Sequence, residues 1–187
     1  REGDEKGAAA KNPMPPSGNN SAYVSNFEFV GTIDNSPFLC VPEAIEWRRQ
    51  LGGEEKIREY CFRLARDGGE MIARRFGTEV LENEEGTLGK CCLTNVRLPI
   101  EANQVAAAAG LEEAQVAGMV VNWMQRTIDA EWNTFIATFF YAGHWWTRLS
   151  AQVYLEMKDF EFAADILEKV CARAENGEFA QWAKSRL

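Results

Sequence analysis

The stretch from 133 to 155, NTFIATFFYAGHWWTRLSAQVYL, constrains the fold more than any other part of the chain. Two runs rich in aromatic and aliphatic residues flank the small residues Ala142-Gly143, and the second run alternates in polarity from Thr147 onward. Alternation with a period of two is typical of a half-buried strand, and a short turn joins antiparallel neighbours. The stretch therefore predicts two paired strands and an antiparallel sheet.

The remaining pattern predicts helices that pack on this sheet. Pro42 suits the first turn of a helix that ends at the glycines 52 and 53, and Gly68-Gly69 suggests that another backbone approaches the next helix closely. In the last helix the inward residues are predicted to be Phe162, Ile166, Leu167 and Val170. The predicted segments are a strand over 91–100 and helices over 42–52, 54–76, 112–129 and 159–173. The fold class expected is a small α+β domain, an antiparallel sheet with packed helices.

Composition limits the classes of partner. The 187 residues carry a net charge of -8, which disfavours nucleic acid and anionic membranes as partners because both require clustered basic residues. No apolar run is long enough to span a bilayer, and the charged start lacks the apolar core of a signal peptide. Residues 1–20 are expected to form a flexible linker or arm, and residues 21–187 a single domain in a cytoplasmic protein.

The five cysteines and the single histidine favour neither a metal site nor a disulfide framework. No Cys-x-x-Cys pair is present, and His144 is distant from every cysteine in the sequence. Cys91 and Cys92 fall in a strand-like run and are expected to point to opposite faces as packing residues. Reduced thiols are the simplest interpretation.

Arg148 is the sharpest candidate for a binding residue. The alternation predicts that it shares one strand face with Ser150, Gln152 and Tyr154. A guanidinium among such groups can hold a carboxylate with two parallel hydrogen bonds, whereas most strand arginines simply face water. The residue pattern by itself leaves both interpretations open and favours the second.

Two further features have both a functional and a structural interpretation. Gly31-Thr32 could hold a phosphate with its hydroxyl and backbone N–H groups, or could be a plain turn. His144 could carry a proton, or could cap the hairpin and pack on the neighbouring indoles. No catalytic triad, paired carboxylates or glycine-rich phosphate loop is present, so no catalytic residue is assigned.

A family resemblance joins Arg148 with the Gly-Thr turn. The stretch FEFVGTIDNSPFLCVPEAIEWRRQLGGEEKIREYC resembles the entry into the C-terminal small domain of class V aminotransferases, and most of all the fungal isopenicillin N epimerase-like and hercynylcysteine sulfoxide lyase-like branch. TRLSAQVYLEMKDFEFAADIL resembles the closing strand and helix of that domain. The resemblance covers about residues 21 to 175 and is strongest over 27–60. The matching residues are Phe29, Gly31-Thr32, Ala44-Ile45, Trp47-Arg48 and Gly52-Gly53-Glu54.

The resemblance implies a pyridoxal 5'-phosphate enzyme of fold type I that works as a homodimer on an amino-acid substrate. In such enzymes the turn that matches Gly31 and Thr32 binds the cofactor phosphate of the neighbouring subunit. The strand arginine that matches Arg148 binds the substrate carboxylate. The implied chemistry is C–S bond cleavage, epimerisation or transamination.

The chain also departs from the family pattern. The family's Schiff-base lysine belongs to a large α/β domain, and no lysine here matches its context: Lys6, Lys11, Lys56, Lys90, Lys158, Lys169 and Lys184. The chain is therefore expected to be a C-terminal part that lacks the large domain. No cysteine lies between Leu93 and Arg148, which disfavours a desulfurase that forms a persulfide. The alternative function is a non-catalytic truncated paralogue or interaction domain.

Overall fold

The computed structural model describes residue 34 and residues 36–184, and contacts divide the chain into two units, 1–47 and 48–187. In the first unit the described residues form a short helix α2 (Ser36–Leu39) and most of α3 (Val41–Gln50), which has no buried residue. Pro42 and the stop before Gly52 agree with the predicted helix. The second unit contains α4 (Gly53–Phe76), β1 (Leu93–Arg97), α5 (Ala102–Ala109), α6 (Glu113–Trp132), β2 (Ala137–Tyr141), β3 (His144–Ser150), α7 (Met157–Glu175) and α8 (Glu178–Lys184).

The three strands form an antiparallel sheet in the order β1-β3-β2, so β3 is paired on both edges. The predicted hairpin is confirmed: Tyr141 faces His144 across a turn in which Ala142 and Gly143 both have positive φ angles, 49° and 81°. Two consecutive positive angles are what a tight hairpin turn of the primed type requires. On the outer edge of β1, Val80 adds an isolated antiparallel bridge to Val96.

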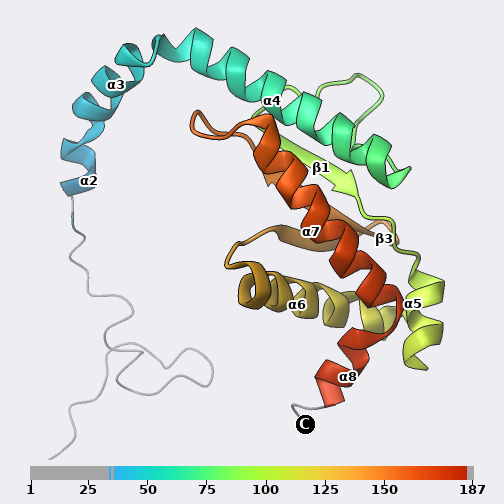
Figure 1. Ribbon diagram of the computed structural model, residues 1–187. Helices are drawn as coiled ribbons and strands as arrows, with labels where there is room; N and C mark the ends of the chain where they lie inside the picture. The colour runs from blue at the N-terminus through green and yellow to red at the C-terminus, as the bar shows by residue number, and fades with distance from the viewer. Residues whose placement is uncertain (1–33, 35, 185–187) are drawn as a thin grey trace, which may run out of the picture. The chain divides into compact units, whose positions relative to one another are not determined.

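Helices cover one face of this sheet (Figure 1). α4 packs on β1 and α7, while α6 packs on β2 and α7. The face that they cover carries Thr94, Val96, Trp145, Thr147 and Leu149, all buried. The Trp145 indole N–H donates to the Ala117 carbonyl of α6 at 3.3 Å, which satisfies the polar atom of a fully buried side chain.

Gly68 and Gly69 mark a close approach, as predicted, but the approaching groups are side chains and not a backbone. A Cβ atom on Gly68 would lie 2.3 Å from Cδ1 of Phe160 on α7. A Cβ atom on Gly69 would lie 2.3 Å from Oγ1 of Thr94 on β1. The two glycines therefore let one helix contact a second helix and the sheet at adjacent positions.

The core combines this sheet face with the inner faces of α4, α6, α7 and α8, where Ile72, Trp123, Met124, Leu167 and Phe179 are among the most deeply buried residues. α7 has the predicted inward residues Ile166, Leu167 and Val170, but the prediction for Phe162 is wrong because its side chain is 49% exposed. Cys91 and Cys92 precede β1 instead of lying in it, and both are half-buried, but Cys92 packs against the core as predicted. Helices α5 and α8 were not predicted.

Candidate functional site

The second face of the sheet brings together the residues of the candidate site. Directly paired residues of neighbouring antiparallel strands project from the same face. The register pairs Asn95 with Arg148 and Arg148 with Ala137 across the three strands. The positions before and after Arg148 on this face of β3 are Trp146 and Ser150. Arg148 thus occupies the centre of this face, between an amide and a methyl group.

The Arg148 side chain is exposed and makes no hydrogen bond or ion pair with the described residues. The other arginine on this face differs: Arg97 lies 3.4 Å from Glu79 and 3.6 Å from Glu101 as ion pairs. A guanidinium without an internal carboxylate keeps its planar fork of donors available to a ligand. Arg148 can therefore receive a carboxylate at this position.

Arg148 also lines a pocket of about 400 Å³ at the end of β3. The pocket lies between the start of β2, the end of β3 and the first turns of α7, and its walls include Phe135, Phe162 and Leu155. Phe135 is 69% exposed, so much of this apolar wall faces solvent. Asp159 of α7 adds a carboxylate, of which one oxygen accepts the Glu156 backbone N–H at 2.7 Å. The pocket can hold a small amphipathic molecule next to a cation.

The polar neighbours predicted for Arg148 are only partly correct. Ser150 is exposed and lies two residues further along β3. Gln152 and Tyr154 do not share the strand, because β3 ends at Ser150 and the chain turns, with the Leu155 N–H donating to the Gln152 carbonyl at 3.0 Å. The neighbour that sequence reasoning missed is Asn95. Its signal was an asparagine in the middle of a strand, where this residue type is depleted.

Gly31 and Thr32, the predicted cofactor-phosphate contacts, lie outside the described residues. His144 is described as the first residue of β3, directly after the hairpin turn and half-buried. Its Nδ1 atom is buried and has no hydrogen-bond partner among the described residues. His144 does not line the Arg148 pocket.

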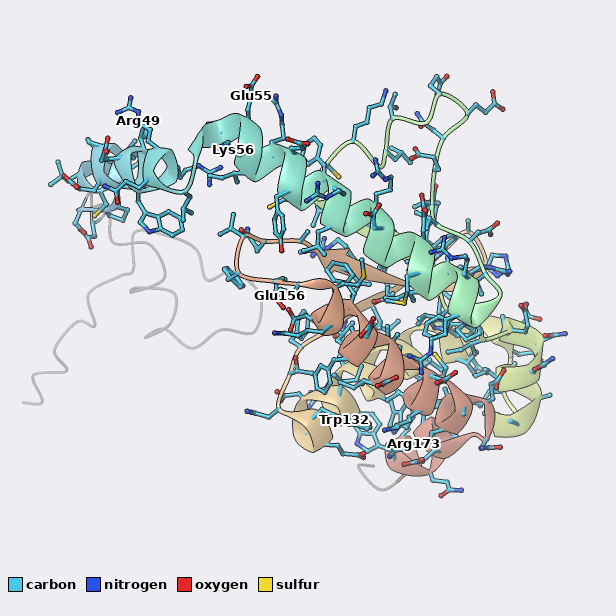
Figure 2. All side chains as sticks on the ribbon, turned by 45° about the horizontal axis from the view of Figure 1, so that its top comes forward. Arg49, Glu55, Lys56, Trp132, Glu156 and Arg173 are labelled. Carbon is cyan, nitrogen blue, oxygen red and sulfur yellow. The ribbon has the colours of Figure 1, made fainter. Side chains whose placement is uncertain are left out.

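A second group of charges lies at the other end of α7 and has a structural role. Figure 2 shows Glu156 at the start of this helix and Arg173 near its far end. The Arg173 guanidinium donates to both oxygens of Glu131 on α6, at 2.8 Å each, and to both oxygens of Glu178 on α8, at 2.7 and 2.6 Å. It also lies 5.6 Å from the ring centroid of Trp123. These contacts join three helices, so this arginine is not available to a ligand.

Other site chemistries find no support in the part of the chain that the structure describes. No cluster of three metal-ligating side chains occurs there. The described lysine side chains of Lys56, Lys90, Lys158 and Lys169 are all exposed, and none lines the Arg148 pocket. Among the helices of residues 36–184, none is both long and apolar enough to span a membrane.

Comparisons with known proteins found similar sequences of fungal origin. No protein-family model matches the chain. The L-cysteine desulfhydrase-like proteins lolT1 and lolT2 of Epichloe uncinata are 35% and 34% identical over 175 and 178 residues, which is 86% and 88% of this chain and 38% of each relative. The hercynylcysteine sulfoxide lyase of Schizosaccharomyces pombe is 30% identical over 139 residues, 74% of this chain and 30% of that protein. The chain thus spans well under half the length of these curated relatives.

Proposed function

We propose that this chain is the substrate-carboxylate-binding part of a pyridoxal 5'-phosphate-dependent C–S lyase that acts on cysteine or a cysteine derivative. The observation that carries the proposal is the exposed Arg148 side chain, without a partner among the described residues, at the centre of the second sheet face and in the wall of a pocket. The names of the relatives, an L-cysteine desulfhydrase-like protein and a hercynylcysteine sulfoxide lyase, support a sulfur-containing amino acid as the substrate.

The role of Arg148 follows from its chemistry. Two parallel N–H donors match the two oxygens of an α-carboxylate, and such charge-assisted bonds are about twice as strong as neutral ones. The apolar wall formed by Phe135 and Phe162 would cover the side of the bound amino acid that faces away from the cation. Together they would hold the substrate in one orientation, which contributes to rate by positioning.

The cofactor itself would be held mainly by residues outside those described. When bound, pyridoxal 5'-phosphate withdraws electrons from the α-carbon of the amino acid. The described residues fit the substrate side of such a site, because they offer a cation for the carboxylate in the wall of a pocket. We propose that Thr32 and Gly31 contact the phosphate of the cofactor in the neighbouring subunit of a homodimer, as the family resemblance implies.

The test uses the full-length protein. We expect pyridoxal 5'-phosphate absorbance in the purified protein, together with release of sulfide from L-cysteine or of a thiol-derived product from a cysteine conjugate. Arg148→Ala should raise KM and lower kcat/KM by a factor of roughly 30 to 1,000, with the cofactor spectrum unchanged. This factor corresponds to a loss of about 2–4 kcal/mol in transition-state stabilisation.

Arg63→Ala is the matched control, because Arg63 is an exposed arginine on α4 and does not line the Arg148 pocket. Racemisation or transamination of the substrate without sulfur release would contradict the lyase assignment. Absence of the cofactor and of any turnover would instead support the non-catalytic alternative. Equal kinetics for Arg148→Ala and the wild type would exclude Arg148 from the site.

A further inference from the structure

We propose that Asn95 is a second substrate-binding residue, which donates an amide N–H to the same carboxylate that Arg148 holds. This inference rests on the function proposed above and adds a residue from β1, a strand that the sequence reasoning did not connect with the site. It makes the carboxylate site a cross-strand pair instead of a single arginine.

The hydrogen-bond ladder sets the spacing of the two side chains. The Leu98 N–H donates to the Trp145 carbonyl and the Ala151 N–H to the Cys92 carbonyl, both at 2.8 Å. Hydrogen-bonded and non-hydrogen-bonded pairs alternate along an antiparallel ladder, and counting from either bond places Asn95 and Arg148 in a non-hydrogen-bonded pair. In such pairs the Cα atoms are only about 4.5 Å apart and the side chains lie closer together.

The backbone of Asn95 confirms this placement, because it bonds away from β3. Its carbonyl accepts the Leu81 N–H at 2.8 Å, on the opposite edge of β1. The side chain is half-buried and has no hydrogen-bond partner among the described residues. The Asn95 side chain therefore lies directly across the strand pair from Arg148 and retains its donors, outside the residues that line the pocket.

A carboxylate can use what this amide offers. Its two oxygens have about four acceptor positions, and a bidentate arginine fills two of them. A neutral amide beside the guanidinium can donate to a third acceptor position of the carboxylate without binding the arginine. An acidic side chain at the same place would form an ion pair with the arginine itself. The neighbour of Arg148 on the other side, Ala137, has no polar side-chain atom, so Asn95 is the directly paired residue that can contribute.

The test measures binding by isothermal titration calorimetry on the full-length protein, with L-alanine and with ethylamine, the same molecule without its carboxylate. Asn95→Ala should weaken L-alanine binding about tenfold, as expected for one hydrogen bond to a charged group, and leave ethylamine binding unchanged. Asn95→Asp should weaken L-alanine binding about a hundredfold or more, because the new carboxylate would pair with Arg148. Asn122→Asp, at an exposed position of α6, adds the same charge elsewhere and should change neither affinity.

Three results would overturn the inference. The first is an Asn95→Ala variant that binds L-alanine as tightly as the wild type, and the second is an equal loss for both ligands. The third is an Asn95→Asp variant with wild-type affinity, which would mean that position 95 only accepts a hydrogen bond from Arg148. If Asn95→Ala does not fold, Asn95→Leu, which has a similar shape and no donor, replaces it. Arg148→Ala separates the two proposals: if it lowers L-alanine affinity while the Asn95 variants do not, only the role of Asn95 fails.

Discussion

The ring of Phe160 lies against the bare backbone of Gly68, at a separation that leaves no room for a single methyl group. The contact joins the middle of α4 to the start of α7, the same helix that forms one wall of the Arg148 pocket. Phe160 is itself 3% exposed and also lines that pocket. The packing of these two helices and the shape of the pocket therefore depend on the same side chain.

Gly68→Ala should destabilise the domain. An added Cβ would overlap the Phe160 ring, and overpacking of this kind costs about 1–3 kcal/mol, only part of which is offset by the roughly 1 kcal/mol that alanine gains over glycine in a helix. We expect a net loss of up to about 2 kcal/mol in the free energy of unfolding, measured by urea denaturation.

Gly118→Ala provides the control for Gly68→Ala. Gly118 also lies inside a helix, but a Cβ there would meet no atom within 4 Å. The same substitution should therefore stabilise the domain by up to about 1 kcal/mol. Two variants with effects of the same sign would show that helix propensity, and not the Phe160 contact, dominates at position 68.

Acid should weaken the cluster around Arg173. The hydrogen bonds from Arg173 lower the pKa of the Glu178 carboxyl below its usual value, so the unfolded chain binds a proton at this residue more readily than the folded chain. The resulting stabilisation is complete above the unfolded pKa, about 4.3, and is lost as the pH falls through the lower folded pKa. Between about pH 6 and pH 3 the stability of the wild type should fall more steeply than that of Glu178→Gln.

Glu161→Gln serves as the control for this pH dependence, since Glu161 is an exposed residue on α7 with no ion pair in the described part of the chain. Its unfolding free energy should follow the wild type across the whole pH range. Parallel curves for Glu178→Gln and the wild type would contradict a role for the Arg173 cluster in acid stability.

The cysteine thiols should differ in reactivity according to how deeply each is buried in the fold. Burial raises the pKa of the Cys171 thiol and, more moderately, that of Cys61, which keeps both protonated and unreactive at neutral pH. Cys40 is exposed. A brief treatment with an aromatic disulfide reagent should label Cys40 at once and leave Cys61 and Cys171 unmodified until the domain unfolds. Mass spectrometry of the digested protein identifies the labelled peptides, and early labelling of Cys171 would contradict its placement in the core.

Thr32→Ala should weaken cofactor retention in the full-length protein. A hydroxyl that donates to a phosphate contributes a charge-assisted hydrogen bond, which is worth about 1.5–3 kcal/mol. The measurement is the Kd for pyridoxal 5'-phosphate after the cofactor has been removed and added back. An unaltered Kd would mean that the Gly-Thr turn does not bind the phosphate. Substrate KM should change little, which distinguishes this variant from Arg148→Ala.

Much of the fold could be predicted because its elements have clear periodic patterns. In the hairpin, α4, α6 and α7, the spacing of the apolar residues and the residues at the ends of the segment predict the same element. The short helices α5 and α8 have no comparable length of pattern, and their burial depends on partners far away in the sequence. Phe162 follows the helical period but lies on the side of α7 that faces the pocket and solvent, which periodicity cannot distinguish from the core side.

The candidate site was predictable only in part. Arg148 could be predicted because an arginine suits a carboxylate ligand and because its surroundings resemble the strand that carries the carboxylate-binding arginine in a known family. The pairing of Arg148 with Asn95 depends on the register between β1 and β3, which are separated by two helices and a strand. The end of β3 at Ser150 removed Gln152 and Tyr154 from the face, although the alternation continues past that point in the sequence.

The central place of β3 also has a consequence for how the domain assembles. β3 pairs with β2 across a two-residue turn. Its pairing with β1 joins segments that are distant in the sequence, so this pairing should form later. The two side chains of the proposed carboxylate site come from the two strands of this later pairing, Asn95 from β1 and Arg148 from β3. A ligand that bridges them would bind the fully assembled sheet and not its precursors, so by mass action it would raise the melting temperature as well as occupy the site.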